Sequence, residues 1–121
     1  MKSIKKSILC FAAFIGLSIP VFAGDKPEFP GGEAALNSYF VENMKYPAMA
    51  RENGVEGIVG VQFIVHTDGS IGAIKIVRMV DPDLEQEAVR LVKTMPAWIP
   101  AEKNGTPVEA STQVNVPFKL N

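Results

Sequence analysis

The sequence predicts an α+β fold in two layers, in which helices pack on one face of a small antiparallel sheet of three strands. Two segments, 55–67 and 71–80, alternate apolar and polar residues on either side of Asp68-Gly69. This dipeptide tolerates a positive φ in a tight turn, so the two segments form a β-hairpin. A third alternating segment, 111–120, follows a helical pattern and returns to the hairpin. Helices and strands in this order are typical of an α+β domain.

The first 23 residues have the composition of a secretion signal. Three lysines lie among the first six residues, and residues 8–17 are an unbroken apolar run of ten. Pro20 breaks any helix, and a small-residue cleavage site ends at Ala23. We therefore expect a cleaved signal peptide and export. The alternative is a short uncleaved membrane anchor, although the 16 residues from 8 to 23 are fewer than the roughly 20 that span a bilayer.

Cleavage after residue 23 leaves an acidic domain. It retains nine of the 12 basic residues and all 13 acidic ones, so its net charge is −4. A domain of this charge does not bind nucleic acid through phosphate contacts. The only cysteine, Cys10, lies in the apolar run, so the exported chain has no disulfide and depends on its hydrophobic core.

Residues 24–32 are rich in proline and glycine, which predicts a linker ahead of a domain over 33–121. Apolar side chains then recur every four residues, at Leu36, Phe40 and Met44. This spacing predicts an amphipathic helix over 33–44. Pro47 suits the first turn of a second, short helix, which ends at Asn53-Gly54.

The helix expected over 82–95 has the clearest boundaries. Asp81 is a suitable N-cap, Pro82 occupies the first turn and Pro96 ends the helix. One apolar stripe runs along it, formed by Leu84, Ala88, Leu91, Val92 and Met95. The stripe predicts that the helix covers the sheet. Trp98, in the loop that follows, is expected to pack in the core, with an exposed contact to a partner as the alternative.

Two strands carry residues that weaken a regular ladder. Gly57 and Gly60 in the first strand predict a bulge or a close neighbour. In the last strand the even positions are apolar and face the core, and the odd positions face outward. Pro117 cannot donate a hydrogen bond to a ladder, so this strand, or its outer side, lies at a sheet edge.

We find no constellation of catalytic or metal-binding residues. His66 is the only histidine, and a metal site needs several converging ligands. No serine lies in a nucleophile elbow. The carboxylates near Asp81 complement the positive end of the helix that they begin. We therefore predict a protein that is not an enzyme and binds no cofactor or metal.

Several short motifs occur in a fixed order along the chain. They are Tyr46-Pro47, Ala50-Arg51, Gly54-Val55-Glu56-Gly57, Asp68-Gly69, Asp81-Pro82, Pro96-x-Trp98-x-Pro100, Asn104-Gly105-x-Pro107-Val108 and Val116-Pro117-Phe118. Each motif alone is weak. Together, from Pro27 to Leu120, their order and spacing resemble the TonB C-terminal domain family.

The resemblance implies a periplasmic domain of Gram-negative bacteria that binds outer-membrane, ligand-importing receptors. The receptor's plug segment, or a segment of another envelope protein, would join a sheet edge as an added strand. A homodimer through the same edges is a further expectation. The candidate partner-binding residues lie on the last strand: Ser111, Gln113, Val114, Asn115, Val116, Pro117 and Phe118.

One departure from the family keeps a second function open. TonB-type transducers carry an anchor and a long proline-rich spacer, whereas residues 24–32 offer nine residues, about 30 Å when extended. The first function is a protein-binding module linked to TonB-dependent transport. The alternative is a structural or peptidoglycan-binding domain without a transport role, because a fold alone does not determine function.

Overall fold

The computed structural model describes residues 24–121. The signal peptide expected in residues 1–23 lies outside this range and stays a prediction. Within residues 24–121, no helix combines the length and the hydropathy that a membrane crossing requires.

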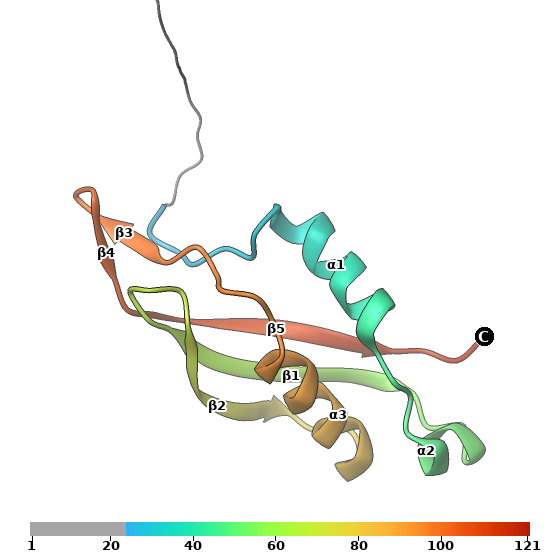
Figure 1. Cartoon of the computed structure of the whole chain (residues 1–121). Helices are drawn as coiled ribbons and strands as arrows, with labels where there is room; N and C mark the ends of the chain where they lie inside the picture. The colour runs from blue at the N-terminus through green and yellow to red at the C-terminus, as the bar shows by residue number, and fades with distance from the viewer. Residues whose placement is uncertain (1–23) are drawn as a thin grey trace, which may run out of the picture.

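The described chain contains the six predicted elements and one additional hairpin (Figure 1). They are α1 (Gly32–Asn43), α2 (Ala48–Glu52), β1 (Gly57–Val65), β2 (Ile71–Arg78), α3 (Pro82–Lys93), β3 (Ala101–Lys103), β4 (Thr106–Val108) and β5 (Ala110–Phe118). The hairpin β3–β4 lies in the segment expected to be a loop. Its strands have three residues each, which is too short for an alternating pattern to appear in the sequence.

The main sheet has the order β2-β1-β5 and is antiparallel throughout, which confirms the predicted α+β architecture. The central strand is therefore β1, and both β2 and β5 are edges. In Figure 1, α3 crosses the face of the sheet at β1 and β2, and α1 lies beside β5. β1 is thus paired on both sides, whereas β2 and β5 each have one unpaired side.

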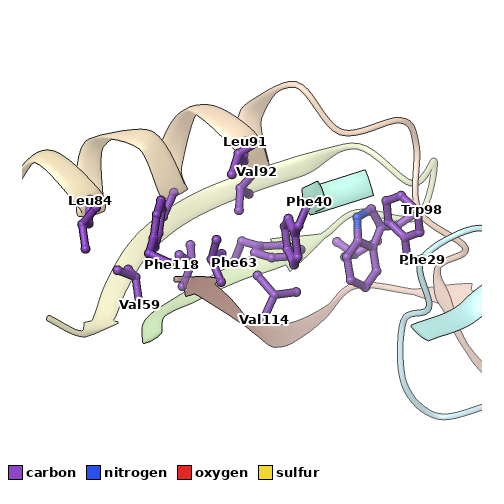
Figure 2. Packing of buried hydrophobic residues seen from close by; sticks show 14 of the residues in the cluster. Phe29, Phe40, Val59, Phe63, Leu84, Leu91, Val92, Trp98, Val114 and Phe118 are labelled. Atoms are coloured by element: carbon purple, nitrogen blue, oxygen red, sulfur yellow. The ribbon is translucent and has the colours of Figure 1, made fainter. Parts of the chain in front are cut away.

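The core lies between the sheet and the two longer helices (Figure 2). The stripe of α3 points into it as predicted, and Leu84, Leu91 and Val92 are fully buried. Trp98 is also a core residue, with 6% of its surface exposed. Its ring packs edge-on against Phe63, with the ring centroids 5.2 Å apart. Burial of these apolar side chains provides the main stabilising free energy of the domain.

Both ends of α3 follow from the local sequence. The Asp81 side chain accepts hydrogen bonds from the backbone N–H groups of Asp83 and Leu84, at 2.9 and 3.3 Å. This confirms Asp81 as the N-cap. The helix ends at Lys93, two residues earlier than predicted, and the Thr94 hydroxyl donates to the Arg90 carbonyl at 3.1 Å.

The segment expected to be a linker is part of the packed domain. Pro27 and Phe29 are buried, and Glu28 exchanges two backbone hydrogen bonds with Ile99, at 2.9 and 2.8 Å. The Phe29 ring packs edge-on against Trp98, with the centroids 5.7 Å apart. The linker prediction was wrong over these residues because proline and glycine indicate irregular backbone, not absence of packing.

The hairpin turn is fixed against the loop after α3. Gly69 has φ of 87°, in the left-handed region that glycine adopts without strain. A β-carbon at this position would lie 2.3 Å from the Trp98 carbonyl oxygen. The Trp98 backbone N–H donates to the Gly69 carbonyl at 2.9 Å. Glycine is therefore required here both by conformation and by space.

Candidate functional site

The two edges of the sheet differ in regularity. The pairing of β2 with β1 shifts register twice, between Gly60 and Val61 and again between Gln62 and Ile64. Ala73, in the second irregular region, has φ of 51°. Such bulges interrupt the row of outward N–H and C=O groups that another strand would pair with. The bulge predicted at Gly60 is confirmed, and it lies on the β2 side.

The pairing of β5 with β1 is unbroken. Nine consecutive pairs run from Gly57 with Phe118 to Val65 with Ala110. Pro117 has no N–H, so it fits this ladder only where its nitrogen faces away from β1. Because the backbone polar groups alternate sides along a strand, the other odd residues of β5 then also turn their N–H and C=O groups to the outer edge.

The exposure of the side chains along β5 also alternates between odd and even residues. Ser111, Gln113, Asn115 and Pro117 are exposed, whereas the even positions face the core. Three of the predicted partner-binding residues, Val114, Val116 and Phe118, are therefore buried, with at most 4% of their surface exposed. A guest strand on the outer edge would meet the backbone of the odd positions. The role of the seven residues as a partner site stays a prediction.

A groove runs along the outer edge of β5, with α1 as its other wall. It consists of two hollows of about 260 and 570 Å³, and Asn37 and Phe40 of α1 line both. The smaller hollow, which we call the acidic hollow, is also lined by Pro27, Glu28, Phe29, Gly32, Glu33, Leu36, Trp98, Gln113, Val114 and Asn115. The larger, the basic hollow, is also lined by Val41, Met44, Tyr46, Arg51, Pro117, Lys119 and Asn121. Together they form the β5 groove.

Hydrogen bonds to α3 hold α1 in its position as the groove wall. The Tyr39 hydroxyl donates to the Leu91 carbonyl at 2.7 Å. At the end of α1, the Arg90 guanidinium donates to the Asn43 carbonyl at 2.8 Å. The next turn is held by Glu87, whose carboxylate accepts a bond from the Lys45 backbone N–H at 2.7 Å. The wall is thus tied to the most deeply packed helix.

Glu87 is the one buried charged residue among the described residues, with 8% of its surface exposed. Desolvation alone would raise its pKa. Hydrogen bonds from Arg90, at 2.7 and 2.8 Å, and from Lys45 outweigh this effect, so the pKa lies below its ordinary value. Glu87 is therefore ionised at neutral pH, and its charge is balanced by Arg90.

The basic hollow has a fixed aromatic side chain beside a cation. The Tyr46 hydroxyl donates to the Val55 carbonyl, and its ring packs edge-on against Phe118, with the centroids 5.8 Å apart. Burial raises the pKa of Tyr46, and Glu56 raises it further, so the hydroxyl keeps its proton. The Arg51 guanidinium lies over the Tyr46 ring, 5.2 Å from its centroid. This contact holds the positive charge at the groove.

The polar residues at the hairpin turn take part in hydrogen bonds that support the fold. His66 Nδ1 lies 2.6 Å from Glu109, at the end of the sheet away from the basic hollow. Ser70 donates from both its backbone N–H and its hydroxyl to the Asp68 carboxylate, at 2.9 and 2.6 Å. These bonds lower the pKa of Asp68. Among residues 24–121, no three histidine, cysteine or carboxylate side chains form a group that could hold a metal ion.

The wall of the groove was not among the predicted site residues. Phe40 and Met44 belong to the stripe assigned to the core. Phe40 is buried behind the groove, with 2% of its surface exposed, and Met44 is half-buried at its side. Val41 lies off that stripe and is 82% exposed. An apolar residue on the polar side of an amphipathic helix is a signal in the sequence that could have indicated this surface.

Comparison with known protein families agrees with the fold described above. The family model described as "Gram-negative bacterial TonB protein C-terminal" matches residues 42–120, which is more than half of the chain. The chain belongs to the TonB C-terminal domain family. The match begins at the end of α1, so it includes the whole sheet, α2 and α3. Most of α1, which forms the wall of the β5 groove, lies outside the matched residues.

A solved TonB C-terminal domain has the same fold. An NMR structure of the domain from Helicobacter pylori superposes with a TM-score of 0.55 at 22% sequence identity, and covers 71% of this chain and 90% of that chain. A longer form of the same domain gives 0.49 at 26% identity, and covers 71% of this chain and 79% of that chain. No curated protein matches the chain. The recognition from sequence motifs is thus confirmed for the TonB C-terminal domain.

Proposed function

We propose that this TonB C-terminal domain is a periplasmic protein-binding module that takes up an extended segment of an outer-membrane receptor as a fourth strand beside β5. The observation that carries the proposal is the combination of an unbroken β1–β5 ladder with a groove along its outer side. An added strand would bond to the backbone of the odd residues, and its side chains on one face would enter the groove.

The choice of β5 over β2 rests on the regularity of the two edges. A guest strand needs donors and acceptors at a constant spacing of two residues. On β5 this spacing is interrupted only at Pro117, whereas the pairing of β2 has two register shifts. A hollow of about 390 Å³ also lies beside β2, but it is confined to the start of the strand, at Ile71 and Ile74. Bulged edges resist strand addition. The proposed role in transport is supported by membership of the TonB C-terminal domain family and by the export expected from residues 1–23.

The proposal is tested by titration calorimetry of the purified protein with peptides from the plug segments of receptors in the same organism. Asn115→Pro removes the N–H that we assign to the outer edge, and we expect binding to weaken by about 1–3 kcal/mol, the cost of an unpaired buried group. Asn115→Ala is the matched control, since it removes the side chain and keeps the donor. We expect it to bind like the wild type.

One control and two outcomes distinguish the alternatives. Circular dichroism of both variants checks that the sheet is intact, because Asn115 lies at an exposed position of an edge strand. Binding that survives Asn115→Pro would move the site to another surface, with β2 as the first candidate. If the wild type binds no plug-segment peptide but is retained by cell-wall fragments, the transport function is wrong and the structural, peptidoglycan-binding alternative is favoured.

A further inference from the structure

We propose that the hollow beside the start of β2 binds a dipeptide with free termini, whose ammonium lies at Asp68, whose carboxylate lies at Lys93 and whose apolar side chain lies between them. We call this hollow the turn hollow. It shares no lining residue with the β5 groove. The inference therefore goes beyond the proposed strand addition and describes a second, separate binding site.

The turn hollow lies between the β1–β2 turn and the end of α3. Its volume is about 390 Å³, which is in the range of pockets that bind small molecules. The turn contributes Asp68 and Ser70, and α3 contributes Lys93, its last residue. The polar groups of the hollow thus come from two different elements of the fold.

The part of the lining between these groups is apolar. Ile71, Ile74 and Met95 pack against the core but are only half-buried, so they keep accessible surface in the hollow. Covering this surface with an aliphatic side chain removes apolar area from water on both molecules. A ligand that fits the hollow therefore carries an apolar side chain as well as charges.

Two opposite charges line the turn hollow without pairing with each other. Neither Asp68 nor Lys93 forms an ion pair with another described residue. An anion attracted by Lys93 is repelled by Asp68, and a cation meets the reverse, so a ligand with both charges complements the hollow best. Because the two residues belong to different elements with apolar side chains between them, a dipeptide suits them better than a single amino acid, which holds both charges on one carbon.

Asp68 is held in the ionised form that a ligand ammonium requires. Ser70 donates to the Asp68 Oδ1 atom from its hydroxyl and from its backbone N–H, at 2.6 and 2.9 Å. These bonds lower the pKa of Asp68, so its carboxylate is charged at neutral pH. Both bonds use Oδ1, so Oδ2 is the oxygen that a ligand ammonium would meet.

The walls of the turn hollow are fixed before a ligand binds. The Trp98 backbone N–H donates to the Gly69 carbonyl at 2.9 Å and joins the turn to the loop after α3. The Trp98 indole N–H donates to the Met95 sulfur at 3.3 Å. Within the turn, the His66 N–H donates to the Ser70 carbonyl at 2.8 Å. A site that is ordered in advance loses little entropy on binding, so more of the interaction is retained.

The experiment titrates the purified protein with alanyl-leucine and follows the amide signals of Gly69, Ser70, Lys93 and Ala97 by NMR. We expect these signals to shift with a Kd of about 1 mM, the affinity typical of a ligand with roughly 14 non-hydrogen atoms. The four residues line the hollow, so shifts confined to them and their neighbours identify the site.

Four reference ligands each remove one feature of alanyl-leucine. The N-acetylated dipeptide lacks the ammonium, alanyl-leucinamide lacks the carboxylate, and glycyl-glycine lacks the apolar side chain. Free leucine keeps all three features but places both charges on one carbon. We expect each to bind at least about threefold more weakly than alanyl-leucine, as for the loss of one exposed ion pair or of an apolar contact.

Two variants assign each charge of the ligand to its partner. Lys93→Gln should remove the advantage of alanyl-leucine over alanyl-leucinamide and keep its advantage over the acetylated dipeptide. Asp68→Asn should do the reverse, and the asparagine oxygen still accepts the bonds from Ser70. Lys75→Gln is the control, because it removes an exposed cation from β2 that does not line the hollow. We expect it to bind every ligand like the wild type.

Several outcomes would overturn this inference. One is the absence of shifts at these amides when alanyl-leucine is far above the expected Kd, and another is shifts confined to β5. If the acetylated dipeptide, the amide, glycyl-glycine or leucine binds as tightly as alanyl-leucine, the hollow does not recognise the feature that the ligand lacks. An equal loss of binding in Lys75→Gln and Lys93→Gln would indicate a general effect of charge. The Asn115→Pro experiment with plug-segment peptides is measured independently, so each proposal can fail without the other.

Discussion

Leu91→Ala tests whether α3 supports the sheet in the way described. Leu91 is fully buried in the cluster that includes Phe63 and Phe118. Its truncation removes apolar contacts and leaves a cavity, because neighbours on a regular helix and sheet relax only in part. Emptying a buried leucine site costs about 2–5 kcal/mol. For a domain near 100 residues, 1 kcal/mol lowers Tm by about 4–8 °C, so we expect a decrease of at least about 8 °C.

The assay is urea unfolding followed by circular dichroism. The midpoint should fall while the m value stays constant, since the surface exposed on unfolding hardly changes. Gln86→Ala is the control, because Gln86 lies on the exposed side of the same helix. We expect its free energy of unfolding to stay within about 0.5 kcal/mol of the wild type. A loss below about 1 kcal/mol for Leu91→Ala would refute the assignment of this face of α3 to the core.

Two further predictions concern Glu87 and the glycines. The folded-state pKa of Glu87 lies below the ordinary 4.5, so its stabilising contribution is present above that pH and is lost as the pH falls through the folded value. Urea melts at pH 7 and pH 3 should therefore show that acid lowers the free energy of unfolding less for Glu87→Gln than for the wild type. An equal decrease would contradict the network with Arg90 and Lys45. Gly54→Ala should cost about 1–2 kcal/mol, because φ is 66° but the space is free. Gly69→Ala should cost more than Gly54→Ala in the same melts, because it adds a collision with the backbone of the loop after α3; equal costs would show that the turn does not dock there.

The periodic elements of the fold could be predicted from the sequence. α3 and β5 each bury one continuous face, so their apolar spacing alone identifies their type and orientation. Asp81 and Pro82 determine the start of α3 by local hydrogen bonding and backbone geometry, which need no tertiary information. The predicted ends were less accurate, as for α3, because fraying at a helix end depends on what packs there.

The features that could not be predicted depend on tertiary contacts. Phe29 is buried because α1 and the loop after α3 bring Tyr39 and Trp98 beside it. The hairpin β3–β4 has too few residues for a period to appear. The β5 groove joins α1 to a strand that begins 67 positions after the helix ends, and no local pattern in the sequence specifies that juxtaposition. The edge position of β5 was indicated by Pro117, and one irregularity on the β2 side by Gly60, whereas the second register shift, near Ala73, was visible only in the structure.

The most direct test of the central claim, that a partner strand adds to the outer edge of β5, is amide hydrogen exchange measured by NMR with and without the peptide that binds most tightly. In the free protein, the amides of Ser111, Gln113 and Asn115 should exchange rapidly, because they face outward, and those of Val114 and Val116 slowly. Peptide binding should protect the three odd positions and leave the even ones unchanged. Protection that appears instead along Ile71–Arg78, or no change on β5 at saturating peptide, would contradict the account.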